Sequence, residues 1–228
     1  MVRLEILDHG SAHDFHHCEP PADDVLTVRR FRISEPALVL GSSQSSDDID
    51  VRRCEIRGVE VARRRSGGGA VLLVPGQHVW IDVFVPAGHV LWDDDVSRSS
   101  HWAGRAWCDV LSPVVRDDSG PLTVHEGRLV PSSWSRVVCF AGIGPGEVVD
   151  SRGRKMVGIS QRRTREWARL QCIVSLVWDA SMLRDLLRDP RPSLDDMSMW
   201  GRTIDGLDDA TVDVMVEDFV RRVRRLSS

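Results

Sequence analysis

Short apolar segments of strand length, separated by turn residues, set the pattern of this 228-residue chain. Pro36 marks a turn between two of them, and Val79, Ile81, Val83 and Val85 alternate with the two-residue period of a half-buried antiparallel strand. The predicted strands are Met1–Gly10 (at a sheet edge), Val25–Ile33, Ala37–Leu40, Val59–Ala62, Ala70–Val74, Gln77–Val85, Val137–Ala141, Glu147–Val149, Lys155–Ser160 and Leu170–Trp178.

Three segments predict helices instead. Acidic residues at Asp93–Asp95 favour a helix N-terminus, and the apolar spacing that follows predicts a helix over Asp94–Leu111. Asp179–Arg188 predicts a short helix, followed by a proline-containing loop at Asp189–Asp196, and Asp208–Leu226 predicts a closing amphipathic helix. Many strands with few helices indicate an α+β fold, a mostly antiparallel sheet with helices packed on it.

The composition limits the class of protein. With 42% apolar and 28% charged residues the chain is expected to fold rather than stay disordered. No apolar run approaches the roughly 18–20 residues of a membrane helix. Met1–Gly10 also lacks the apolar core of a secretory signal, so we expect a cytoplasmic protein without membrane contact. A net charge of −4 gives no general attraction to nucleic acid.

The cysteines and histidines do not form a metal-binding pattern. The five cysteines are odd in number and contain no CxxC pair, which favours reduced thiols in the cytoplasm. His13, His16 and His17 lie close together, but no Cys/His cluster elsewhere in the sequence matches them. We therefore expect no metal site.

The segment Arg63–Val71 contains three successive glycines, Gly67, Gly68 and Gly69, between two predicted strands. Three successive glycines let the backbone approach a ligand closely, and their N–H groups can bind a carboxylate or phosphate. A flexible hairpin turn is the alternative. The neighbouring arginines add charged donors, so we favour a ligand-binding loop.

Lys155 is the only lysine among the 30 basic residues; the other 29 are arginines. Lysine is a compact charge on a flexible stem, whereas arginine presents a broad planar fork. At the start of a predicted buried strand, a lysine costs desolvation unless it meets an anion or a polarised carbonyl. Cys139 precedes a Gly/Pro loop, which allows exposure at a rim, although burial as a small apolar residue is the ordinary fate of a free cysteine.

These segments, in this order and spacing, resemble motifs of the lipoate-protein ligase and octanoyltransferase family, whose members are relatives of biotin-protein ligases. Arg63–Val71 matches the family's RRxSGGGAV run, and Gly153–Arg162 matches its GRKxxGxxQR run. Leu40–Gln44 is similar to the family's strand ending in a GxxQ turn. The resemblance extends from about Ala37 to Asp179.

This resemblance implies a fold, a reaction and a set of site residues. The fold is the mixed sheet with flanking helices of the biotin/lipoate-protein ligase catalytic domain, over residues 1–179, with 180–228 as a C-terminal helical extension packed on the same domain. The reaction attaches a lipoyl or octanoyl group to a lysine of the lipoyl domains of 2-oxoacid dehydrogenases or of the glycine cleavage H protein. The family's lysine falls on Lys155. The residues expected to bind the acyl group or substrate are Arg64, Ser66, Gly67, Gly68, Gly69, Ala70, Gly158, Ser160 and Gln161.

Three functions stay open. An octanoyltransferase takes its acyl group from acyl carrier protein and needs no cofactor; one branch uses a cysteine in a C-F-x-x-P loop, which Cys139-Phe140 resembles although Pro145 comes two residues later. A ligase activates lipoate with ATP and Mg. The family's histidines are missing, with Cys172 near one of their positions, which allows a divergent or non-catalytic acyl-binding member. We favour the transferase, with Cys139 as nucleophile, Lys155 as the charge on the acyl carbonyl, and Cys172 as an alternative nucleophile or pocket lining.

Overall fold

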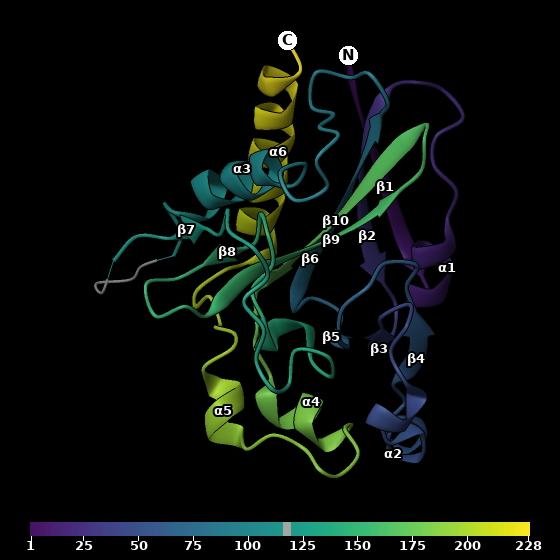
Figure 1. Ribbon diagram of the computed structural model, residues 1–228, viewed down its shortest axis with the longest axis vertical. Helices are drawn as coiled ribbons and strands as arrows, with labels where there is room; N and C mark the ends of the chain where they lie inside the picture. The colour runs from purple at the N-terminus through teal and green to yellow at the C-terminus, as the bar shows by residue number, and fades with distance from the viewer. Residues whose placement is uncertain (116–119) are drawn as a thin grey trace.

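The computed structural model describes residues 1–115 and 120–228, and two sheets form its frame (Figure 1). Only β1 and β2 pair in parallel in the larger sheet, so it is mixed and mostly antiparallel, as predicted. Its seven strands run in the order β1 (Val2–Gly10), β2 (Leu26–Ile33), β6 (His78–Pro86), β10 (Trp167–Ser175), β9 (Lys155–Arg163), β8 (Val148–Val149) and β7 (Thr123–Val124). The smaller sheet has the order β4 (Glu60–Arg63), β3 (Ala37–Leu40), β5 (Val71–Leu73).

Two helices cover one face of the large sheet. α3 (His101–Leu111) and α6 (Asp209–Leu226) pack against each other, with the Trp107 and Phe219 rings stacked at 4.2 Å. Apolar residues from both helices and from β6, β9 and β10 form one continuous core. The amphipathic pattern of residues 208–226 thus predicted α6 correctly, and Asp208 caps its N-terminus.

The smaller sheet and most of the short helices lie at the end of the molecule away from the two chain termini (Figure 1). α1 (Ala12–His17) packs with Phe31 and Trp80, and the rings of Phe15 and Phe31 lie 4.8 Å apart. A third core joins the small sheet to the remaining helices. These are α2 (Val51–Ile56), α4 (Ala180–Asp185), α5 (Leu194–Ser198) and the 3-10 turns η1 (Ser46–Asp48) and η2 (Cys139–Ala141).

β6 is buried on both faces, so the prediction of a half-buried strand was wrong. Val79, Ile81, Val83 and Val85 belong to the core with α3 and α6, and they alternate with Trp80, Asp82 and Phe84 on the opposite face. The Asp82 carboxylate is fully buried and is paired with Arg169, and the Trp80 indole N–H donates to it at 2.8 Å. With these partners, a buried charge is tolerated on the strand face that the sequence pattern assigns to solvent.

Two other predicted elements were also wrong. The helix expected from Asp94 begins only at His101, because Asp93 and Asp95 accept hydrogen bonds from backbone N–H groups two residues on and hold residues 93–99 in turns. Val137–Ala141 is not a strand: it makes one bridge, between Val138 and Ala70, and then turns as η2. Its apolar residues pack in the third core instead.

The C-terminal segment contributes to two of the cores. α6 supplies the core under α3, and α4 and α5 supply Leu183 and Met197 to the core beside the small sheet. The Lys155 N–H also donates to the Trp200 carbonyl at 2.8 Å. Within the described residues, no helix is both long and apolar enough to span a bilayer.

Candidate active site

The Arg64 guanidinium organises the glycine loop. Burial lowers its pKa, and it donates to the carbonyls of Gly67 (2.7 Å), Gly69 (2.8 Å) and Val39 (3.2 Å). Most of its N–H groups are therefore used within the loop. Arg64 therefore supports the loop, and its side chain also helps to line a cavity, so its binding of substrate stays a prediction.

Two glycines of this region are required by close backbone contact. A Cβ at Gly41 would lie 1.9 Å from the Gly68 carbonyl oxygen, and one at Gly69 would lie 2.6 Å from the Val138 nitrogen. Gly68 has a φ of +96°, which favours glycine. Gly67, in contrast, faces open space. The run of glycines thus serves to pack the loop tightly against the Cys139 segment.

Hydrogen bonds join this loop to Cys139. The Ala70 N–H donates to the Val137 carbonyl at 2.8 Å, and the Cys139 N–H donates to the Ala70 carbonyl at 2.9 Å. Gln44, in the GxxQ turn, donates from Nε2 to the Val137 carbonyl at 2.9 Å. Three motifs that are far apart in the sequence therefore hold one short segment in place.

A β-bulge at the start of β9 determines which way Lys155 points. Lys155 and Val157 pair with adjacent residues of β8, so β9 carries one extra residue, Met156. Met156 and Val157 both contribute to the core under α3. The bulge leaves Lys155 on the same side as Gly158, where the lysine Cδ is 3.8 Å from the position of a Gly158 Cβ.

The Lys155 ammonium lies against Cys139 and is only 1% exposed. Its Nζ donates to the Cys139 carbonyl at 2.8 Å, and the Phe140 ring centroid is 5.3 Å away. Four covalent bonds separate that carbonyl oxygen from the Cys139 Sγ, so the two atoms are at most about 5 Å apart. Nζ and Sγ are therefore separated by no more than about 8 Å.

Glu147 balances the lysine charge, and the sequence analysis missed it. Its Oε2 lies 2.7 Å from the Lys155 Nζ and accepts from the Gly144 N–H at 2.6 Å. Its Oε1 accepts from the Ile159 N–H at 3.2 Å. A glutamate at the end of the Gly/Pro loop after Cys139 was the available signal. The carboxylate fixes both that loop and the start of β9 around the lysine.

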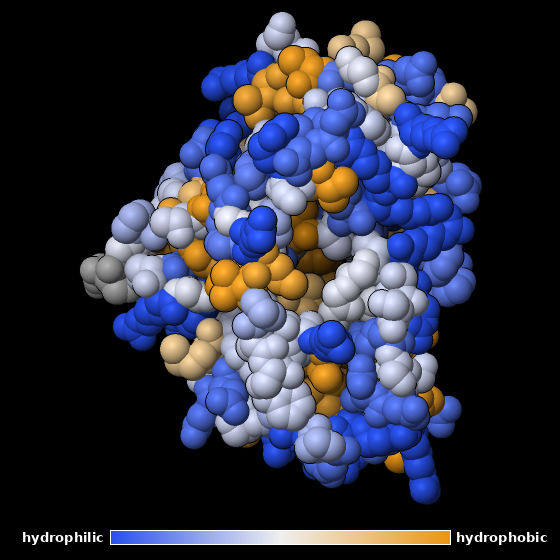
Figure 2. Space-filling model, in the orientation of Figure 1, coloured by the Kyte–Doolittle hydropathy of each residue, from blue (hydrophilic) through white to orange (hydrophobic). Residues whose placement is uncertain are grey.

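A small, mostly apolar cavity lies beside these residues, and the predicted site residues Cys139, Gly158 and Ser160 are among those that line it. Its walls come from β5, β6, β9, β10, η2 and α1. Figure 2 shows this face of the molecule hollowed over the large sheet, with apolar residues in the floor of the hollow.

Other predicted site residues lie outside this cavity. Ser66 is buried behind the wall and donates to Ser160 (2.9 Å) or Gln171 (3.1 Å). Gln161 points to the opposite face of β9, where its Oε1 accepts from Ser99 at 2.9 Å. The prediction for Gln161 is therefore wrong because strand alternation separates it from Ser160. The loop residues Gly67, Gly68, Gly69 and Ala70 are not among those that line the cavity, and of these Gly69 and Ala70 pack against the segment that contains Cys139.

Cys172 is neither an accessible nucleophile nor pocket lining. It is fully buried in the core under α3, between two residues of β10 that face the cavity. Burial and the neighbouring Asp82 raise the pKa of its thiol far above the ordinary value. The alternative role predicted for Cys172 is therefore wrong, and Cys139 is the cysteine that reaches the cavity.

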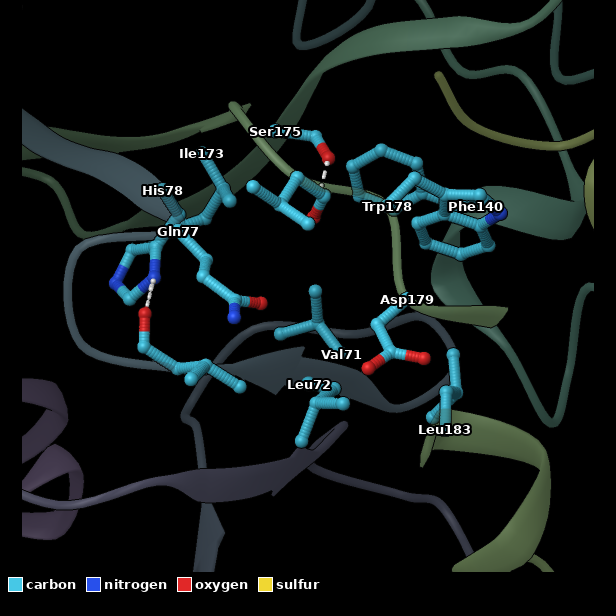
Figure 3. Close-up of a pocket in the computed structure, with 12 residues that line it drawn as sticks. Val71, Leu72, Gln77, His78, Phe140, Ile173, Ser175, Trp178, Asp179 and Leu183 are labelled. Carbon is cyan, nitrogen blue, oxygen red and sulfur yellow. Dashed lines mark hydrogen bonds between the residues drawn. The ribbon is translucent and has the colours of Figure 1, made fainter. Parts of the chain in front are cut away.

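A second cavity shares Val71, Phe140 and Ile173 with the first. In Figure 3 the Gln77 amide and the Asp179 carboxylate point toward its open space, and His78 lies at one side. The His78 Nδ1 lies 2.9 Å from the Val74 carbonyl, to which it donates, and burial lowers the pKa of the ring to about 4. His78 is thus a neutral ring at this wall.

No group of three or more His, Cys, Asp or Glu side chains within residues 1–115 and 120–228 is arranged to hold a metal ion. The site consists of a thiol, a paired lysine, backbone donors and an apolar cavity. Such a set can bind an acyl chain and form a thioester.

Several solved structures share this fold. A bi-partite lipoate protein ligase from Thermoplasma acidophilum, described with its E2 lipoyl domain, is 15% identical, with a TM-score of 0.69 over 97% of this chain and 83% of that chain. A lipoate-protein ligase A bound with ATP is 16% identical, with a TM-score of 0.69 over 97% and 85%. P. falciparum LipL1 in complex with lipoate is 10% identical, with a TM-score of 0.66 over 99% and 63%. At these identities the likeness shows the fold.

The family itself is shown by sequence. No match is found among curated protein sequences. The family model described as the lipoyl protein ligase A/B catalytic domain matches residues 16–225, nearly the whole chain. Its members are enzymes of lipoyl and octanoyl transfer. The motifs around Lys155 and the glycine loop, the fold and this match agree, and the chain belongs to the lipoyl protein ligase A/B catalytic-domain family.

Proposed function

We propose that this enzyme takes an octanoyl or lipoyl group from acyl carrier protein, holds it as a thioester on Cys139, and transfers it to a lysine of a lipoyl-domain protein. The proposal rests on Cys139, the cysteine that lines the apolar cavity, and whose backbone is bonded to Lys155 and to the glycine loop. All five cysteines are free thiols, which suits the reducing cytoplasm as the proposed compartment.

In the first step the Cys139 thiolate attacks the carbonyl carbon of the donor thioester. A bond from that carbon to Sγ forms, the bond to the carrier sulfur breaks, and the carrier leaves as a thiol after taking up a proton. In the second step the neutral amine of the acceptor lysine attacks the same carbon. The amide bond forms, Sγ leaves, and the proton lost by the amine returns the cysteine to its thiol form.

Lys155 is proposed to stabilise the oxyanion in both steps. The Lys155 ammonium has three N–H bonds. Among the described residues, two oxygen atoms lie within hydrogen-bonding distance of its Nζ: the Cys139 carbonyl oxygen and a Glu147 carboxylate oxygen. One N–H is left for the developing oxyanion, and donors placed in advance in a dry site are worth more than in water. The same ammonium also holds the Cys139 backbone, so Lys155 has a positioning role as well.

The ATP-dependent ligase is the alternative, because one structure with this fold is described as bound with ATP. A triphosphate requires cationic partners. The second cavity has Asp179 in its wall and no arginine or lysine, and in the first the one cation, Arg64, is occupied by loop carbonyls. The residues that line the two cavities do not fit a triphosphate, which supports the transferase.

Mass spectrometry after incubation with octanoyl-acyl carrier protein tests the proposal. We expect an adduct of octanoyl mass on Cys139 that Cys139→Ser abolishes and that needs no ATP. Cys108→Ser is the matched control, because Cys108 is half-buried on α3 and lines neither cavity. Acyl transfer that requires ATP and survives Cys139→Ser would establish the ligase instead.

A further inference from the structure

Arg64 is a buried cation that has no carboxylate partner among the described residues. It is only 4% exposed, and its guanidinium donates to the backbone carbonyls of Val39, Gly67 and Gly69. These carbonyl oxygens satisfy its N–H groups, but they carry no net charge. A buried charge is costly unless an opposite charge compensates it. The loop therefore satisfies the hydrogen bonds of Arg64 and leaves its charge uncompensated.

The carboxylates buried in this part of the protein do not supply the missing negative charge. Glu147 is paired with Lys155 at 2.7 Å, and Asp82 is paired with Arg169. Each of these two pairs is neutral. The cluster of Arg64, Lys155 and Glu147 thus holds two cations and one carboxylate, which leaves a net charge of +1. A further anion close to Arg64 would make the cluster neutral.

The His16 ring, which α1 places at the first cavity, is not that anion. Burial, followed by the charges of Arg169 and Arg64, lowers the pKa of this ring well below its usual value. The ring is therefore neutral, and the Arg64 charge is one of the influences that keep it so. The other polar side chains of the cavity wall, Ser160 and Gln171, are uncharged.

Cys139 is the remaining titratable side chain of the cavity wall, which it shares with Arg64. The two are held by neighbouring peptide groups: the Arg64 Nη2 donates to the Gly69 carbonyl at 2.8 Å, and the Cys139 N–H donates to the Ala70 carbonyl at 2.9 Å. Burial lowers the pKa of Arg64, and the charges of Cys139 and then Glu147 act in the opposite direction. A thiolate at Cys139 is thus an anion that can compensate Arg64.

We propose that Arg64 is the counter-ion of a Cys139 thiolate, so that the free enzyme holds its nucleophile ready for attack, with the thiol proton released to water. This rests on the proposed function, since it takes Cys139 as the nucleophile. It deepens that function by separating the roles of the two buried cations. Arg64 acts through Cys139, whereas Lys155, already balanced by Glu147, donates to the oxyanion.

Alkylation of the full chain by iodoacetamide, measured at Cys139 by mass spectrometry from pH 5 to pH 10, tests this without any acyl donor. The thiolate reacts and the thiol does not, so the half-maximal rate should fall below about pH 7.5, against about 8.5 for an ordinary thiol. Arg64→Gln should raise this midpoint by at least about one pH unit. Arg64→Lys keeps the charge and should retain most of the lowering. Arg65→Gln is the matched control, because Arg65 is the exposed neighbour and pairs with Glu19.

The plateau of the same profile separates charge from structure. Loosening of the glycine loop changes access to the thiol and hence the plateau rate, whereas loss of the cation moves the midpoint. A second variant, Glu147→Gln, carries the opposite expectation if Arg64→Gln does not fold. It removes the one carboxylate of the cluster, so the midpoint should move below that of the wild-type protein.

Three outcomes overturn the proposal: a wild-type midpoint near that of an ordinary thiol, an unchanged midpoint in Arg64→Gln, or equal midpoints in Arg64→Gln and Arg64→Lys. Failure of the proposed transferase gives a different result. A low midpoint that Arg64→Gln raises, with no octanoyl adduct on Cys139, supports the thiolate pair and contradicts the transferase. An adduct that forms while the Arg64→Gln midpoint is unchanged supports the transferase and overturns the pair.

Discussion

Lys155 and Glu147 form an ion pair in which Nζ and Oε2 are 2.7 Å apart and both side chains are almost completely buried. Removing one partner leaves an uncompensated buried charge, which typically costs about 3–5 kcal/mol. We therefore expect Glu147→Gln to lower the free energy of unfolding by about that amount, although the amide is nearly the same size. Urea denaturation followed by tryptophan fluorescence measures it.

The control for this prediction is Glu126→Gln. Glu126 pairs with Arg105 at the surface, where both side chains are well exposed, so the loss should stay below about 1 kcal/mol. Equal losses of unfolding free energy in the two variants would show that the buried ion pair contributes no more to stability than the exposed one.

Replacing Lys155 by arginine tests the single lysine directly. The wider guanidinium has to fit between the Glu147 carboxylate, the Cys139 carbonyl and the Phe140 ring, and such overpacking costs about 1–3 kcal/mol. It also displaces the donor proposed for the oxyanion, so single-turnover acylation should slow by on the order of 10²-fold. Arg165→Lys, at an exposed position, should change neither quantity. Normal turnover by Lys155→Arg would mean that the lysine is not used for chemistry.

The glycine loop offers a matched pair of substitutions. Gly69→Ala would place a Cβ within 2.6 Å of the Val138 nitrogen and displace the Cys139 segment, whereas Gly67→Ala meets open space. We expect Gly69→Ala to reduce Cys139 alkylation by a thiol reagent and transfer together. Gly67→Ala should leave the free energy of unfolding unchanged to within about 0.5 kcal/mol. Loss of acyl transfer in Gly67→Ala instead would indicate that its backbone touches the substrate.

The elements were predictable where one physical pattern determined them. Ala37–Leu40 matches β3, and the amphipathic run after Asp208 matches α6, because burial of one stripe follows directly from apolar spacing. The start of α3 failed because local hydrogen bonds of Asp93 and Asp95 compete with helical ones. α1 was missed, since its six residues are mostly polar and a histidine is one of those it buries.

The site was predictable only in part. Motif spacing brought Cys139, Gly158 and Ser160 to one cavity and Lys155 next to Cys139, but it also predicted Gln161 at the site. The bulge at Met156, which turns Lys155 toward Cys139, leaves no signal in the sequence because it depends on pairing with β8. The position of His16 at the cavity could not be predicted for a similar reason, since it depends on the tertiary packing of α1.

His78 predicts a pH dependence of stability. The pKa of its ring is lowered from 6.5 to about 4 in the folded state, so between these values the unfolded chain binds a proton that the folded chain does not. The free energy of unfolding should therefore fall as the pH falls from about 6.5 to about 4. His78→Gln keeps a donor for the Val74 carbonyl and should flatten this fall in urea titrations. The same change at exposed His13 controls for the loss of a histidine, and an unchanged slope in His78→Gln would contradict the prediction.

Gly158 tests the identity of the cavity as the acyl site. A Cβ there would make only ordinary contacts, at 3.6 Å from Glu147 and Phe140 and 3.8 Å from Lys155, so Gly158→Ala should fold with little loss of stability. The added methyl group would occupy cavity space next to Cys139. Turnover of octanoyl thioesters should therefore fall several-fold relative to hexanoyl or butyryl thioesters, because the shorter chains need less of the cavity. Ala168→Gly, on β10 in the core toward α3, would lower stability without changing that ratio. An unchanged ratio in a well-folded Gly158→Ala protein would place the acyl chain elsewhere.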